Sequence, residues 1–252
     1  MGSTLAIGEY RGAIRLNPSL VMAHVGLGIA LITKGDIDGA IEEYRAALRL
    51  NPNRADTHSD LGRALFRRGN FDGAIEQFRT AVLLNPNLAD SHIALGAALV
   101  AKGDIDGAIE EFHTALRLNP NLADAHSDLG IALGNKGDID GAIEEFRTAV
   151  RLNPNLAKAH AGLGAALHRK GDIDGGIEEY RTAVRLDPNL ADAHYNLGMA
   201  LIEHGNESAA AKELEEFIRI APNTPSNLQK IDRAKKRLDR LRFFPEEKPG
   251  NF

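Results

Sequence analysis

The chain has 252 residues, a formal net charge of −5 and no cysteine. The missing cysteines exclude disulfide scaffolds, thiol catalysis and cysteine-ligated zinc, and the negative charge makes a general nucleic-acid binder unlikely on electrostatic grounds. No apolar run approaches the ~20 residues of a membrane span, and the first ten residues lack the features of a secretion signal. We therefore expect a soluble, cytoplasmic protein.

Prolines recur along the chain at a constant interval of 34 residues. A fixed period in this range predicts a solenoid of stacked repeats rather than a globular enzyme. Function is therefore expected on a surface, without catalytic residues. The periodic prolines are Pro18, Pro52, Pro86, Pro120, Pro154, Pro188 and Pro222.

Residues 1–20 fit the second helix of a repeat whose first helix is absent. Ala6, Tyr10 and Ala13 precede Pro18 at the spacing of the later repeats. We expect either that the chain was cut from a longer array or that a neighbouring molecule completes the unit head to tail, because an incomplete unit leaves apolar surface uncovered.

Residues 21–224 divide into six repeats, each predicted to form two amphipathic helices. In the unit 123–156, Leu129 and Leu133 belong to the apolar stripe of the first helix, and a second stripe follows from Ile139 onwards. Such stripes can be buried only against each other and against the next repeat.

The helix boundaries of this unit also follow from its residues. Asn121 and Asp138 are predicted N-caps, since their side-chain oxygens can accept from free amides at a helix start. Gly137 and Pro154 are predicted helix stops.

This unit resembles the tetratricopeptide repeat family, whose 34-residue helix-turn-helix units share a pattern of small and aromatic residues. The resemblance covers residues 21–224. It implies an all-α fold: a right-handed α-solenoid superhelix of antiparallel helix pairs that binds proteins without catalysis. The residues that carry it in this unit are Leu129, Gly130, Ala142, Phe146, Ala149 and Pro154.

Two departures from the family pattern stand out. Histidine occupies the fourth place of every repeat, where the family often has an aromatic residue. Stacked helices lie about 8–10 Å apart, too far for these histidines to share a zinc ion, so we expect packing residues and neither metal nor cofactor. The last repeat has Leu214 and Phe217 in place of the usual aromatic and alanine. The histidines are His24, His58, His92, His126, His160 and His194.

Residues 225–244 are predicted to form a capping helix with Thr224 as its N-cap and Pro225 in its first turn, followed by a tail at 245–252. Its outer side is strongly basic. We expect this side to keep the cap soluble; the alternative is contact with an anionic partner. The basic residues are Lys230, Arg233, Lys235, Lys236, Arg237, Arg240 and Arg242.

Comparison of the repeats with one another shows where they differ. Most differences between neighbouring units fall on the face of the first helix that points away from its apolar stripe. In the family resembled, this face lines a concave groove that holds peptides or partner helices. The predicted groove residues are Met22, Val25, Ile29, Asp56, Asp60, Arg63, Phe66, Arg67, Ile93, Ala97, Val100, Asp124, Asp128, Ile131, Asn135, Lys158, His168, Arg169, Tyr195, Asn196 and Met199.

The sequence thus predicts a scaffold that binds an extended or helical protein segment of mixed polarity in this groove. The basic clamp with which some family members hold chaperone tails is absent, because no repeat has a basic residue at its fifth place. The alternative is a self-assembling structural protein that packs head to tail through its incomplete first repeat.

Overall fold

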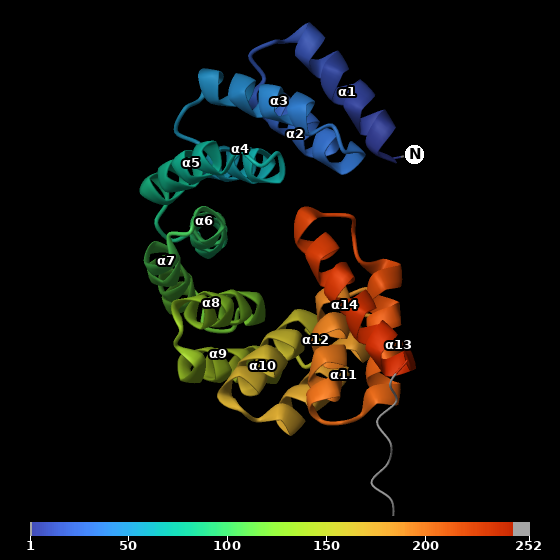
Figure 1. The fold of residues 1–252 in the computed structure, drawn as a ribbon. Helices are drawn as coiled ribbons and strands as arrows, with labels where there is room; N and C mark the ends of the chain where they lie inside the picture. Colours follow the sequence, from blue (N-terminus) through green and yellow to red (C-terminus); the bar gives the residue numbers. More distant parts are fainter. Residues whose placement is uncertain (1, 244–252) are drawn as a thin grey trace, which may run out of the picture. The chain divides into compact units, whose positions relative to one another are not determined.

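The computed structural model describes residues 2–243, with the side chains of residues 2, 3, 242 and 243 left aside. This part of the chain is all-α, and its helices follow one another as antiparallel pairs (Figure 1). The predicted tail at 245–252 lies outside it. The helices are α1 Gly2–Leu16, α2 Val21–Lys34, α3 Ile37–Leu50, α4 Ala55–Arg67, α5 Phe71–Leu84, α6 Ala89–Lys102, α7 Ile105–Leu118, α8 Ala123–Lys136, α9 Ile139–Leu152, α10 Ala157–Lys170, α11 Ile173–Leu186, α12 Ala191–Glu203, α13 Glu207–Ile220 and α14 Pro225–Phe243.

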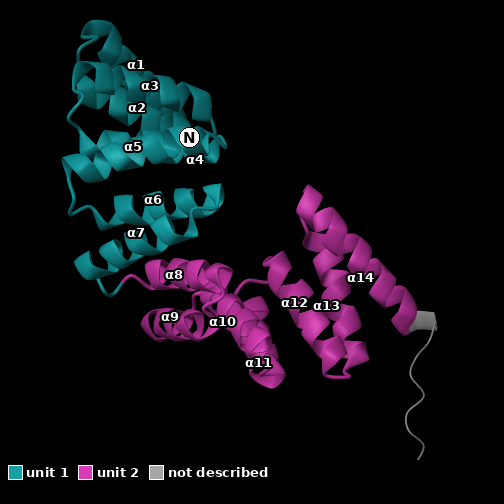
Figure 2. Ribbon diagram, turned by 60° about the vertical axis from the view of Figure 1, so that its left-hand side comes forward, with its two compact units in different colours: residues 1–121 teal, residues 122–252 magenta. Residues whose placement is uncertain are grey.

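The chain consists of two compact units, residues 1–121 and residues 122–252, coloured separately in Figure 2. The boundary falls between α7 and α8, between two repeats. Each unit is a short α-solenoid in which a helix contacts the helices before and after it. In both units the first helices of consecutive repeats also contact each other. Helix α4 contacts α6 in the first unit, and α8 contacts α10 in the second.

The turns within the repeats form as their residues predict. Gly137 follows α8 with φ 96°, a left-handed conformation that only glycine adopts without strain. Asp138 then caps α9, because its carboxylate accepts a hydrogen bond from Gly141 N at 3.0 Å. The prediction for Asn121 is wrong. Leu122 precedes α8 without any side-chain cap, and Asn121 instead donates its backbone N–H to Asn119 Oδ1 at 3.0 Å, which closes the turn around Pro120.

The core is built from the apolar stripes that the 34-residue period predicts. In the second complete repeat, Leu61 of α4 and Phe78 of α5 are 3% and 1% exposed. The helices approach closely here because Gly62 has no side chain; a Cβ atom at this position would lie 2.6 Å from the Phe78 ring. In every complete repeat except the last, the Leu-Gly pair and the aromatic residue therefore act as one packing element.

The repeat histidines join three segments of the chain. His92 Nε2 donates to the backbone carbonyl of Pro86 at 3.0 Å, and its Nδ1 lies 2.6 Å from Glu111 Oε2 on the second helix. The same two contacts recur in other repeats, with Gln77 in place of the glutamate beside His58. These histidines thus tie each helix pair to the turn before it.

We expect Glu111→Ala to lower the free energy of unfolding by about 1.5–3 kcal/mol, because it removes a charge-assisted partner of a buried ring. Glu111→Gln should lower the free energy of unfolding much less, since Gln77 is the hydrogen-bond partner of His58 in another repeat. Urea denaturation measures both, with Glu110→Ala on the exposed side as the control. Equal losses for Glu111→Ala and Glu110→Ala would show that the histidine contact contributes nothing.

Ion pairs also link the second helix of one repeat to the end of the first helix in the next. Lys102 Nζ lies 2.9 Å from Asp72 Oδ1, and Lys170 Nζ lies 2.6 Å from Asp140 Oδ1. The helix dipole also favours a lysine at this end of the first helix. The structure adds a cross-repeat partner, worth little singly because the pairs are exposed.

α14 covers the last repeat. Its Ala234 and Leu238 are buried in one cluster with Leu214 and Phe217 of α13. The exchanged aromatic and alanine positions of that repeat are explained by this cluster, because Phe217, which stands where the other repeats have alanine, packs against α14. The Thr224 hydroxyl accepts from Asn227 N at 3.3 Å, which starts the helix as predicted.

Candidate protein-binding face of the first helices

In each unit, the first-helix face is defined as the side of the first helices that carries the residues in which the repeats differ. The first helices are α2, α4 and α6 in the first unit and α8, α10 and α12 in the second. Most predicted groove residues keep exposed area there. The exposed ones are Met22, Ile29, Asp56, Arg63, Arg67, Asp124, Ile131, Asn135 and Arg169. The half-buried ones are Asp60, Phe66, Ile93, Ala97, Val100, Asp128, Lys158, His168, Tyr195, Asn196 and Met199.

Val25 is the exception, because it is only 6% exposed and belongs to the core. The fifth position of a repeat points toward the neighbouring repeat; Ser59 and Ser127 at this position are buried as well. Tyr195 is also less available than predicted. Its ring packs 5.1 Å from that of Phe217, and the Lys230 ammonium of α14 lies 5.7 Å from its centroid.

A small pocket of about 210 Å³ opens on this face between α4 and α6. The Phe78 ring, Ala94 and Ala97 form its apolar part, and Arg63 and Arg67 stand on its rim. Small-molecule sites usually measure ~300–1,000 Å³, so this volume suits a single side chain better. Phe66 completes the lining and packs edge-on against Phe71 at 5.2 Å.

A second pocket of about 170 Å³ lies between α8 and α10 in the other unit. Its Phe146, Gly162 and Ala165 stand 68 residues, or two repeats, after the equivalent residues of the first pocket. Gly134 leaves space where Phe66 stands in the first pocket. Arg169 at this rim is already engaged, since its Nη1 donates to the Gly134 carbonyl at 2.8 Å.

Charges on this face differ between the two units. In the second unit, Lys158 Nζ lies 2.8 Å from Asp124 and 3.3 Å from Asp128. Burial raises the pKa of Asp128, and Lys158 opposes that rise. Burial lowers the pKa of Lys158, but the two carboxylates outweigh it and the pKa is raised. The positive charge of Lys158 is therefore already paired with the negative charges of Asp124 and Asp128.

In the first unit, Asp60 has no such lysine. Burial raises the pKa of its carboxyl; Arg63 opposes the rise and Asp56 adds to it. A half-buried carboxylate without a bonded cation is costly, which makes this acidic position a candidate contact for a partner.

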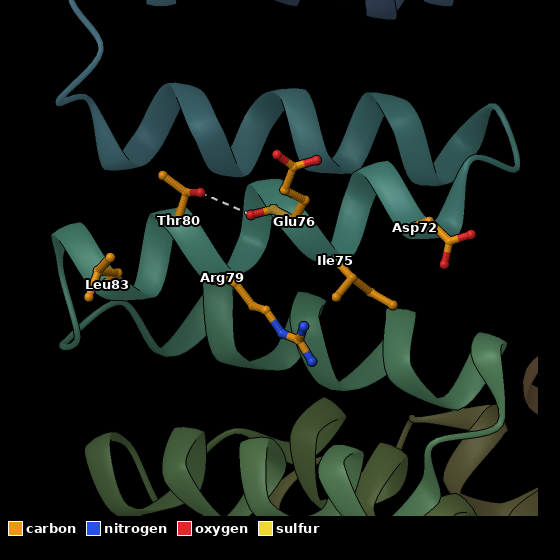
Figure 3. A pocket seen from close by; sticks show the side chains of 6 residues that line it. All are labelled: Asp72, Ile75, Glu76, Arg79, Thr80 and Leu83. Atoms are coloured by element: carbon orange, nitrogen blue, oxygen red, sulfur yellow. Dashed lines mark hydrogen bonds between the residues drawn. The ribbon is translucent and has the colours of Figure 1, made fainter.

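A hollow of about 390 Å³ lies on the second-helix side of the first unit (Figure 3). All of its lining residues belong to α5, among them Leu83, which is 82% exposed. Asp72 is paired with Lys102, and the Thr80 hydroxyl donates to the Glu76 carbonyl at 3.0 Å. The hollow therefore lacks groups that converge from two helices.

Two kinds of feature are absent from residues 2–243. No group of three or more histidine, cysteine, aspartate or glutamate side chains there is placed to hold a metal ion. Nor is any helix in this range long and apolar enough to cross a membrane.

Sequence reasoning names first-helix residues of these pockets but misses the aromatic side chains that complete them. Phe78 and Phe146 line the two pockets, although their repeat pattern predicts only packing residues. The register of the repeats could have predicted the pockets, because the aromatic residue of one repeat contacts the first helix of the next.

Comparison with known families finds repeat matches along nearly the whole chain. The family described as "TPR repeat" matches residues 96–137, 132–171 and 166–205. Families described as "Tetratricopeptide repeat" match residues 3–55, 31–102 and 191–224. No curated protein matches the chain.

Several solved structures are similar. The APC/C hetero-tetramer Cut9-Hcn1 matches with a TM-score of 0.79 and 21% identity over 92% of this chain. This chain spans only 46% of that one. MamA is 30% identical with a TM-score of 0.59, over 66% of this chain and 96% of its own. YrrB, described as a TPR protein with an unusual peptide-binding site, is 25% identical with a TM-score of 0.56, over 78% of this chain and 99% of its own.

Proposed function

Because the chain belongs to the tetratricopeptide repeat family, we propose that it is a non-catalytic scaffold that holds a protein segment on its first-helix face. One observation carries the proposal: this face has pockets of side-chain size, between α4 and α6 and between α8 and α10, beside unburied charges. Apolar contact in a pocket surrounded by selective charges is the usual basis of peptide recognition.

The related structures support this reading. YrrB has a described peptide-binding site and is 25% identical to this chain. Large apolar side chains of the face, Met22 and Ile29, are 61% and 51% exposed, although the apolar stripes of the same repeats are buried. Exposed apolar side chains beside charges are typical of an interaction surface.

Capture of partners from a lysate of the source cells tests the proposal. The bait is the full chain, compared with a variant that carries Arg63→Glu, Phe66→Ala and Arg169→Glu. We expect the variant to capture at most about one tenth of the amount of specific partners that the unchanged chain captures. The three substitutions remove pocket contacts and reverse two charges.

The matched control carries Arg79→Glu and Arg147→Glu on the exposed side of second helices. It should capture as much as the unchanged protein. Equal capture by all three baits would rule out the first-helix face, and loss only in the control would move the site to the second helices.

The alternative is head-to-tail self-assembly through α1. Leu5 and Leu16 of this helix are 68% and 90% exposed, which leaves apolar surface for another copy. A molecular mass that rises with concentration in light scattering, and that Leu5→Lys abolishes, would favour this function over the first.

A further inference from the structure

The first unit carries three aspartates in the N-terminal halves of two neighbouring first helices. Asp56 and Asp60 belong to α4, and Asp90 stands in the first turn of α6. Asp56 and Asp90 are favoured by the helix dipole. That reason does not extend to Asp60, which lies a turn further along and is half-buried. Within residues 2–243 none of the three makes an ion pair.

In the second unit, the equivalent pair of aspartates binds a lysine. Two repeats later, Asp124 and Asp128 stand at the positions of Asp56 and Asp60, and Lys158 replaces Asp90. The Lys158 ammonium bonds both carboxylates, at 2.8 Å and 3.3 Å. The first unit therefore has the same carboxylate pair with its cation missing and a third acid in its place.

The rest of α4 adds an apolar site and positive charge. Toward its C-terminal end come Arg63, Phe66 and Arg67, which line the pocket with Ala94 and Ala97. Neither arginine makes an ion pair with any residue that the structure describes. The face thus changes from acidic to apolar and basic over one helix. Asp60 and Arg67 are about 10 Å apart along the axis, the span of about three residues in an extended chain.

We propose that this part of the first unit binds an extended protein segment with a lysine or arginine on the three aspartates and an apolar side chain in the Phe66 pocket. An acidic residue about three positions from the basic one completes the match at Arg67. The inference rests on the proposed function and specifies its partner. Such a partner supplies from outside the cation that Lys158 supplies within the second unit.

Selection of random 12-residue peptides displayed on phage, with the full chain as target, tests this inference. We expect enriched peptides to contain Lys or Arg near an apolar residue. Synthetic copies should bind the Asp90→Lys variant at least ~10-fold more weakly in fluorescence anisotropy, because the new lysine fills the acid cluster itself. This variant should unfold at the same temperature as the parent or higher, so weaker binding would not reflect unfolding.

Glu76→Lys on α5 makes the same charge change away from the site and should leave binding unchanged. Enriched peptides without a basic residue, or peptides that bind Asp90→Lys as well as the parent, would overturn the inference. If Phe66→Ala still weakens those peptides, the proposed function stands. Failure to enrich any peptide would count against both. The parent protein could also fail to bind peptides while Asp90→Lys differs from it in oligomeric mass. This result would identify a second copy of the chain as the occupant of the site and overturn the inference.

Discussion

Deleting residues 55–88, one whole repeat, is expected to leave a shorter protein that still folds. Residue 89 then takes the place of residue 55, so α3 meets α6 with the apolar stripe that it met in α4. In a linear array each repeat contacts only its neighbours, and removal of one in register changes no type of interface. The helical circular-dichroism signal per residue should stay constant, with a cooperative thermal transition.

Deleting only residues 55–70 should have the opposite result. This removes α4 and its turn, so the buried Phe78 face of α5 loses Leu61 and Leu65. Losing two such leucines costs more than ~5 kcal/mol, which the array cannot recover by a shift of register. Equal stability of the two deletion proteins would mean that the 34-residue unit is not the unit of folding.

Phe78→Ala is expected to lower the free energy of unfolding by about 3–5 kcal/mol. The ring is 1% exposed and fills the space that Gly62 leaves open between α4 and α5. Truncation to alanine empties that space, so a cavity should remain. Urea denaturation followed by circular dichroism measures the loss.

Leu83→Ala on the same helix is the control. This leucine is 82% exposed, so its truncation should change stability by less than about 0.5 kcal/mol. A loss at Phe78 no larger than that at Leu83 would contradict the packing described for α4 and α5.

Much of the fold could be predicted from the sequence because the same pattern of residues recurs in every repeat. The glycine stops, the aspartate caps of the second helices and the alternation of stripes depend on residues close in the chain. The exchange of Leu214 and Phe217 is visible in the sequence, and its reason is the contact of this repeat with α14. Asn121 was misassigned because the asparagine side chain that acts here is that of Asn119, which closes the turn by accepting the backbone N–H of Asn121.

The candidate site was less predictable because it depends on contacts between repeats. The direction of Val25 is decided by the neighbouring repeat, and its burial cannot be inferred from one helical period. The two partners of His92, Pro86 and Glu111, lie on two other segments of the chain, so the pattern predicts a packing histidine without its hydrogen bonds. The pockets need the aromatic residue of one repeat beside small residues of the next, as with Phe146 and Gly162.

The central claim is that the first helices bury one side within the array and leave the other free to bind. The chain has no cysteine, so single cysteines can report on each side of α4. Arg63→Cys lies on the first-helix face, and Ala64→Cys replaces a residue that is 1% exposed.

The decisive measurement is the rate at which each thiol reacts with iodoacetamide, relative to the same variant in urea. We expect Arg63→Cys to react nearly as fast as when unfolded and Ala64→Cys to react at least ~100-fold more slowly, because its thiol is reached only through local opening. Protection at Arg63→Cys, or equal rates at the two positions, would contradict the account.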